Sequence, residues 1–146
     1  STCGAMGYSG PAGVSAALAH KDQLVLSFVG DGGFMMSGQE LATAAQYGAT
    51  PIVLLFNNGI YGTIRMHQER DHPERISGTT LINQDFCKMA EGYGAHAERV
   101  TKTADFAAAF ERARASGRPA LIELVTNPEQ ISTRTTITKL RDAAKK

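Results

Sequence analysis

Two groups of polar residues stand directly after short, mostly apolar runs of this sequence. Gly-Asp-Gly-Gly at 30–33 follows the run 24–29, and Asn-Asn at 57–58 follows the run 52–56. Both runs contain β-branched residues and are bounded by turn residues, which predicts buried strands of a parallel sheet. Because ligands bind outside the carboxyl ends of strands in open α/β sheets, we expect Asp31 and Asn58 to lie at one edge of the sheet.

The residue types in these two groups suit a divalent cation and a phosphate. The oxygens of Asp31 and Asn58 are hard ligands of the kind that Mg²⁺ takes, and Mg²⁺ usually shares its coordination shell with phosphate oxygens. Gly30 permits a close approach of the backbone, and the amides of Gly32 and Gly33, which lead toward a helix, suit the phosphate itself. The sequence therefore predicts a site for a metal and a diphosphate.

Each of these residues also has a purely structural interpretation. Asp-Gly is a common hairpin turn and Asn58-Gly59 is a strong turn signal, so both polar residues would then only shape loops. The glycines would serve only to permit positive φ angles. A hairpin does not suit a run that feeds a helix, and the two groups fit one site together, so we favour the metal-binding hypothesis. For Asn57 a structural hydrogen bond in the loop is an equally good interpretation.

The combination of Gly-Asp-Gly at 30–32 with Asn-Asn at 57–58 resembles the signature of thiamine diphosphate (ThDP) enzymes. Other segments resemble the acetolactate synthase-like and 2-oxo acid decarboxylase members of that family over nearly the whole chain: Gly4–Tyr8, Pro11-Ala12, Phe34–Met36, Gln39–Ala44, Asp85-Phe86, Gly94 and Pro119–Glu123. The resemblance implies the family's α/β fold, a doubly wound, mostly parallel sheet with helices on both faces. It also implies ThDP and Mg²⁺ as cofactors.

The resemblance assigns roles that the spacing alone does not. The backbone carbonyl of Ile60 would be the third protein ligand of Mg²⁺, beside Asp31 and Asn58. The carbonyl of Gly4 and the amide of Met6 would contact the aminopyrimidine ring. The Met6 side chain would hold the cofactor bent, so that its amine reaches the thiazolium carbon. The alternative for Met6 is ordinary core filling, which is what most methionines do.

His67 and the nearby Arg65 fall in the segment that borders the substrate in related enzymes, where a histidine orients a carboxylate or moves a proton. Acetolactate synthases carry a Trp where His67 falls, and this sequence contains no Trp. This departure argues against acetolactate formation itself. We interpret His72 and His96 as surface or packing residues. Several charged residues nearby are expected to form a solvated face: Glu69, Arg70, Asp71, Glu74 and Arg75.

By this resemblance the chain is the C-terminal, cofactor-binding domain of an enzyme that decarboxylates or ligates a 2-oxo acid substrate. ThDP carries that chemistry, and the protein supplies geometry and electrostatics. Family members activate the cofactor with a Glu from the pyrimidine-binding domain of a neighbouring subunit, and nothing in these residues matches that motif. We therefore expect a homodimer or homotetramer and no turnover by this chain alone. A full-length protein with FAD is compatible with the resemblance, but this domain would not bind it.

Two alternatives belong to other functional classes. A non-catalytic ThDP-binding or assembly module would keep Asp31 and Asn58, because these residues report binding only. A dinucleotide-binding oxidoreductase domain requires Gly-x-Gly-x-x-Gly after the first strand and an acidic residue about 20 positions later. The stretch 30–35 does not have that spacing. The oxidoreductase is therefore disfavoured, and the non-catalytic module stays open.

Bulk properties bound the remaining options. A chain of 146 residues fits one domain with a sizeable core. Its formal net charge of +1 gives no field that attracts nucleic acid or an anionic membrane. The sequence has no apolar stretch long enough to cross a bilayer and no secretory signal. Cys3 and Cys87 form no Cys-x-x-Cys motif, so we expect free thiols and a cytoplasmic protein. Because the sequence begins without Met, at Ser1 and close to the predicted cofactor loop, we expect a fragment of a longer polypeptide.

Periodicity and turn signals predict helices alternating with strands, and hence parallel pairing with right-handed crossovers. Helices are expected at 11–20, 38–47, 86–93 and 103–116, and strands at 24–29, 52–56, 96–100 and 120–125. Residues 59–83 lack clear periodicity, which indicates a long functional loop or a short irregular helix. We predict a ThDP- and Mg²⁺-binding domain at 1–130 and a polar tail at 131–146. The basic stretch 134–146 of that tail would be a solvated helix or arm rather than a nucleic-acid site, because it lacks interleaved aromatic residues.

Overall fold

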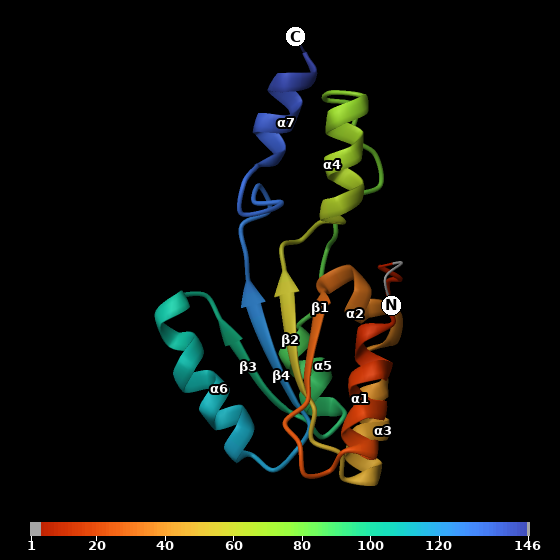
Figure 1. The fold of residues 1–146 in the computed structure, drawn as a ribbon, viewed down its shortest axis with the longest axis vertical. Helices are drawn as coiled ribbons and strands as arrows, with labels where there is room; N and C mark the ends of the chain where they lie inside the picture. Colours follow the sequence, from red (N-terminus) through yellow and green to blue (C-terminus); the bar gives the residue numbers. More distant parts are fainter. Residues whose placement is uncertain (1–3, 146) are drawn as a thin grey trace. The chain divides into compact units, whose positions relative to one another are not determined.

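The computed structural model of the protein describes residues 4–145. Its elements, in chain order, are α1 (Ser9–Ala19), β1 (Leu26–Gly30), α2 (Asp31–Ser37), α3 (Glu40–Tyr47), β2 (Ile52–Asn57), α4 (Gly62–Asp71), α5 (Phe86–Gly92), β3 (His96–Val100), a 3-10 turn η1 (Thr103–Asp105), α6 (Phe106–Ala115), β4 (Ala120–Val125) and α7 (Ile137–Ala144). The four strands form one parallel sheet in the order β1-β2-β4-β3, with helices on both faces (Figure 1). The predicted α/β class with a doubly wound, parallel sheet is confirmed.

The chain divides into two compact units. The first contains the residues up to 57 together with 84–125, and the second contains 58–83 together with the residues from 126 onward. The sheet and all helices except α4 and α7 belong to the first unit, while those two helices pack on each other in the second. Each unit thus combines segments that are far apart in the sequence. No helix in residues 4–145 has the length and apolar character that a membrane crossing requires.

The register of the sheet brings the carboxyl ends of neighbouring strands level with one another. Gly30 in β1 pairs with Phe56 in β2, and Asn57 at the end of β2 pairs with Val125 at the end of β4. Side chains that follow β1 and β2 therefore leave the sheet at the same edge. This is the edge at which open parallel sheets bind their ligands.

Alternate residues of the strands supply an apolar core on each face of the sheet. Val53 and Leu55 of β2 pack with Phe86 of α5 in a cluster that also includes residues of α2 and α3. On the opposite face, Leu54 packs with Ala109 and other residues of α6. Burial of each large aliphatic or aromatic side chain contributes about 1.5–3 kcal/mol. These two clusters pack helices against both faces of the sheet.

The edge strand β1 carries apolar side chains that the helices leave exposed. Leu26 is 38% exposed and Phe28 is 59% exposed, and the Phe28 ring stacks on that of Phe56 with centroids 6.3 Å apart. On this face α6 packs mainly on β3 and β4, the two strands on the other side of the sheet. The Phe28–Phe56 pair is therefore an exposed apolar surface of the first unit.

Helix boundaries differ from the predicted ones at two places. A helix already begins at Asp31, so the predicted helix 38–47 is the second of two short helices, α2 and α3. The latter ends at Gly48, which has a φ of +67° and closes the helix in the left-handed conformation that glycine adopts most easily. In the segment 59–83, where a loop or a short irregular helix is predicted, α4 is a regular helix of 10 residues. Its few apolar residues explain the weak periodicity.

Candidate functional site

Asp31 lies where β1 leads into α2. Gly30 precedes the helix in an extended conformation, with φ −79° and ψ 159°, and Asp31 is the first helical residue. Asp31 is buried, with 3% of its surface exposed, and its Oδ1 accepts a hydrogen bond of 3.0 Å from the Gly32 amide. A carboxylate in the first turn of a helix is favoured by the positive end of the helix dipole. The fold therefore places a carboxylate oxygen at the end of the strand.

The three glycines around Asp31 have different surroundings. A Cβ added at Gly30 would meet nothing within 4 Å, whereas one at Gly33 would lie 3.3 Å from Cγ2 of Val29. Gly30 thus leaves open space at the end of β1, and Gly33 permits close packing of α2 on the strand. The amides of Gly32 and Gly33 lie in the first turn of α2, where amides have no carbonyl partner within the helix. The Gly32 amide is a predicted phosphate donor. In the structure it donates to the side chain of Asp31.

Asn57 ends β2, at the same edge of the sheet as Asp31. Gly30 and Phe56 are paired, so Asp31 and Asn57 each follow directly from a paired position. The Asn57 Nδ2 donates a hydrogen bond of 2.7 Å to Oε1 of Glu123 in β4. Asn57 thus makes a structural hydrogen bond, to a strand residue rather than within the loop.

In the second unit, a turn joins Asn58 to Ile60. Oδ1 of Asn58 accepts a hydrogen bond of 3.1 Å from the Ile60 amide, and Gly59 between them has a φ of +69°. Ile60 also forms an isolated antiparallel bridge with Thr80. The turn predicted as the structural alternative is therefore present. It does not exclude metal binding, because an amide oxygen has two lone pairs and one of them suffices for this hydrogen bond.

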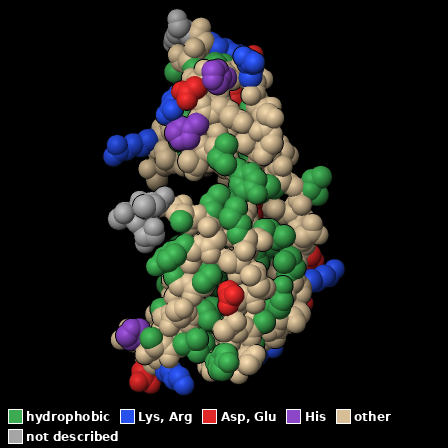
Figure 2. Space-filling model, turned by 90° about the vertical axis from the view of Figure 1, so that its right-hand side faces the viewer, with side chains coloured by type: hydrophobic (Ala, Val, Ile, Leu, Met, Phe, Trp, Pro, Cys, Tyr) green, Lys and Arg blue, Asp and Glu red, His purple; other side chains and the backbone are tan. Residues whose placement is uncertain are grey.

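Gly4 and Met6 lie in the segment that precedes α1, and both are exposed. Met6 is 46% exposed and lines an open hollow of about 590 Å³ together with Tyr8 and with residues of α1 that include Pro11. Core filling, the alternative for Met6, is therefore wrong. Figure 2 views the side of the first unit that carries α1 and α3, where hydrophobic side chains gather at the surface. A half-exposed methionine beside a hollow is available to a ligand.

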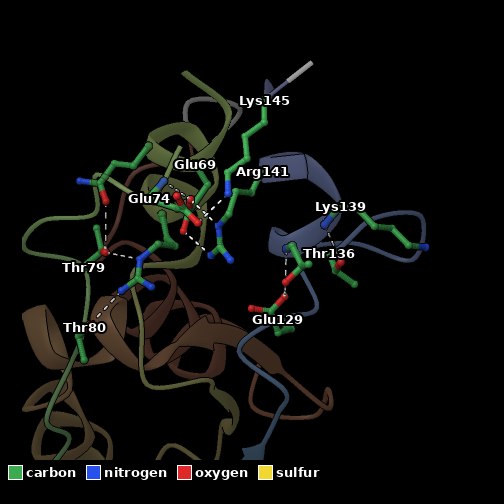
Figure 3. Close-up of polar contacts among 12 residues, drawn as sticks. Glu69, Glu74, Thr79, Thr80, Glu129, Thr136, Lys139, Arg141 and Lys145 are labelled. Carbon is green, nitrogen blue, oxygen red and sulfur yellow. Dashed lines mark hydrogen bonds and ion pairs between the residues drawn. The ribbon is translucent and has the colours of Figure 1, made fainter. Parts of the chain in front are cut away.

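Arg65 and His67 lie on α4 and face different surroundings. His67 is exposed. Arg65 donates from Nε to Oγ1 of Thr79 at 2.6 Å and from a terminal nitrogen to Oγ1 of Thr80 at 2.9 Å, so it fastens the returning segment to the helix (Figure 3). Of these two residues, His67 has the exposed side chain, whereas Arg65 is engaged in hydrogen bonds within the second unit.

Glu69 contradicts the prediction of a solvated face on α4. Its side chain is fully buried, and both carboxylate oxygens accept from the guanidinium of Arg141 on α7, at 2.8 and 2.5 Å (Figure 3). The backbone amide of Glu74 donates to the same carboxylate at 2.9 Å. The Arg141 hydrogen bond is the main cause that lowers the pKa of Glu69 from 4.5 to about 2. Part of the predicted solvated tail is thus bound to α4.

The buried, hydrogen-bonded states of two carboxylates, Glu69 and Glu123, are not predicted from the sequence. The pairing of Glu69 cannot be predicted because its partner lies 72 positions away and no sequence pattern in α4 indicates which side is buried. Glu123 does leave a signal, since it is the single charged residue within the apolar strand β4 and is 2% exposed. A lone carboxylate in a buried strand indicates a polar partner inside the protein.

The donor chemistry of the predicted ligands fits Mg²⁺. Asp31 provides a carboxylate, Asn58 a carboxamide oxygen and Ile60 a backbone carbonyl, all hard oxygen donors. In the part of the chain that the structure describes, no group of three or more His, Cys, Asp or Glu side chains has the arrangement to hold a metal ion. A competing site of that type is therefore absent from residues 4–145. Of the two cysteines, Cys3 lies outside these residues.

Comparison with known proteins gives a consistent result. Residues 1–124 match the family described as "Thiamine pyrophosphate enzyme, C-terminal TPP binding domain". The chain is 34% identical over 128 residues to the probable acetolactate synthase large subunit of Methanocaldococcus jannaschii, covering 87% of this chain and 22% of that protein. It is 37% identical over 134 residues to the 3D-(3,5/4)-trihydroxycyclohexane-1,2-dione hydrolase of Bacillus subtilis, covering 87% and 21%.

A solved structure supports the same relationship. The thiamine diphosphate-dependent 4-hydroxybenzoylformate decarboxylase of Rhodococcus jostii superposes with a TM-score of 0.79 and 36% sequence identity, over 84% of this chain and 23% of that one. The chain thus spans about a fifth of the length of the relatives that it matches.

Proposed function

Since the chain belongs to the thiamine pyrophosphate enzymes as their C-terminal TPP-binding domain, we propose that it binds the diphosphate of ThDP through Mg²⁺. Asp31, Asn58 and the carbonyl of Ile60 are the proposed protein ligands of the metal. The first-turn amides of Gly32 and Gly33 are the proposed donors to the phosphates, with Gly30 giving the backbone room to approach. The Gly32 amide would then exchange its bond to Asp31 for one to a phosphate oxygen.

One observation supports this proposal most strongly. A buried carboxylate stands at the end of β1, level with the end of the neighbouring strand β2, whose next residue along the chain is Asn58. A carboxylate oxygen at the end of a strand is a hard donor of the kind that Mg²⁺ takes. The Asx turn at Asn58 supports the same role because it restrains the rotamer of the side-chain oxygen.

The other proposed contacts concern the aminopyrimidine and the substrate. The carbonyl of Gly4 and the amide of Met6 are proposed to bind the ring, and the exposed Met6 side chain to support the bent cofactor. His67 is proposed to face the substrate, a 2-oxo acid, where it would orient the carboxylate or move a proton. When bound, ThDP supplies the electron sink for decarboxylation or carboligation. The partner proposed to complete the site is the pyrimidine-binding domain of a neighbouring subunit.

The experiment compares thermal unfolding of the chain with and without ThDP and Mg²⁺. A ligand at about 100 times its Kd stabilises the folded state by about 2.7 kcal/mol, so the melting temperature should rise measurably. Asp31→Ala should abolish this rise, and omission of Mg²⁺ should do the same. Asp22→Ala, which changes an exposed aspartate before β1, is the matched control and should keep the full response. An equal rise in Asp31→Ala and the wild type would contradict the proposal.

A further inference from the structure

Glu123 of β4 contacts residues from three other elements of the first unit, namely β2, β3 and α5. Its Oε1 accepts from Asn57 of β2 at 2.7 Å, and its Oε2 accepts from Nε of Arg99 in β3 at 2.7 Å. Sγ of Cys87 in α5 donates to the same Oε2 at 3.7 Å. Burial, followed by the charge of Glu123, raises the pKa of the Cys87 thiol to about 11, so this cysteine stays a neutral donor.

From these contacts we propose that Glu123 is a positioning residue for the Mg²⁺ and diphosphate site and that it acts through Asn57. The inference rests on the proposed function. Asn57 is the last residue of β2, and the next peptide bond leads to Asn58, a proposed metal ligand. The hydrogen bond to Glu123 fixes the Asn57 side chain and with it the direction in which the backbone leaves the strand. Metal ligands are commonly oriented by such outer partners.

The surroundings of Glu123 fit positioning better than stabilisation. Arg99 neutralises the carboxylate and also donates to Oδ1 of Asp85 at 3.1 Å, the residue whose side chain caps α5. Glu123 is therefore held from the β3 side while it holds Asn57 on the β2 side. Apolar residues of similar volume stabilise an interior as well as a buried ion pair does, so stability alone gives no reason for a carboxylate here. The need for a fixed hydrogen-bond acceptor for Asn57 explains why a carboxylate stands at this position.

The test measures the dissociation constant of ThDP in saturating Mg²⁺, and of Mg²⁺ in saturating ThDP, by calorimetric titration. Asn57→Ala and Glu123→Ala should weaken Mg²⁺ binding about 10- to 100-fold, the usual effect of removing an outer partner of a metal ligand. Glu123→Gln keeps an acceptor oxygen for Asn57 and should restore binding to within about threefold of the wild type. Should Asn57→Ala fail to fold, Asn57→Ser keeps a small polar side chain and is expected to show the same loss.

Glu98 provides the matched control. It is a carboxylate of the adjacent strand β3, and its oxygens are paired with Arg112 and His96. Glu98→Ala should lower the melting temperature without changing either dissociation constant. Unchanged Mg²⁺ binding in folded Asn57→Ala or Asn57→Ser, or an equal loss in Glu98→Ala, would overturn the positioning role alone. Absence of Mg²⁺-dependent ThDP binding in the wild type would overturn the proposed function and this inference with it.

Discussion

A buried carboxylate requires partners, and Glu69 has them in the guanidinium of Arg141 and the amide of Glu74. Removal of only one partner leaves a charge in a site that excludes water. We expect Arg141→Met to lower the free energy of unfolding by about 3 kcal/mol, as is typical for a broken buried pair. Urea unfolding measures this change.

Two further variants show whether the pair acts as a unit. Glu69→Leu combined with Arg141→Met should be more stable than Arg141→Met alone, because no unpaired charge remains. Arg70→Ala removes an exposed ion pair on the same helix and should leave the urea midpoint unchanged. A double variant no more stable than Arg141→Met alone would contradict the assignment of a desolvated pair.

The same residue predicts a pH dependence. The folded-state pKa of Glu69 is about 2, below its ordinary value of 4.5. Its contribution to stability is therefore complete above pH 4.5 and is lost as the pH falls toward 2. Urea unfolding between these pH values should show the wild type losing more stability than Glu69→Gln, which has no carboxyl group to protonate. Parallel pH profiles for the two proteins would refute the lowered pKa.

At the scale of elements, α1 approaches β1 closely enough to require glycine at one position. A Cβ at Gly13 would lie 2.8 Å from Cβ of Ser27, an atom near the backbone that has no room to move away. Gly13→Ala should therefore cost about 1–3 kcal/mol through overpacking. Gly92→Ala in α5 meets no atom within 4 Å and should be neutral or stabilising by up to about 1 kcal/mol. Chemical unfolding of both variants distinguishes steric conflict from helix propensity.

The elements also show what the sequence can and cannot predict. Strands and most helices follow from local patterns, because apolar periodicity and glycine stops such as Gly48 act within a few residues. The strand exits at Asp31 and Asn57 are predicted for the same reason. The Glu69–Arg141 and Asn57–Glu123 contacts join residues 72 and 66 positions apart, and local patterns carry no information on such pairs. The regular helix α4 is not predicted because it packs on α7 and has no apolar stripe of its own.

At the scale of the whole molecule, the chain corresponds to about a fifth of each relative that it matches. We propose that the carboxylate which activates the aminopyrimidine comes from the pyrimidine-binding domain of a neighbouring subunit. We expect the chain with ThDP and Mg²⁺ to release no CO₂ from pyruvate or longer 2-oxo acids above the rate of free ThDP. A coupled assay for CO₂ or aldehyde checks this, and turnover by the chain alone would contradict the proposed need for a partner domain.

Asp31 and Asn58 are the proposed ligands of one metal ion that also binds the ThDP diphosphate. A crystal structure of the chain grown with ThDP and Mn²⁺, with anomalous scattering to locate the metal, tests this proposal directly. We expect one octahedral ion at about 2.1 Å from an Asp31 carboxylate oxygen, Oδ1 of Asn58 and the Ile60 carbonyl, with phosphate oxygens in its shell. Anomalous density elsewhere, or at only one of these residues while ThDP is bound, would contradict it.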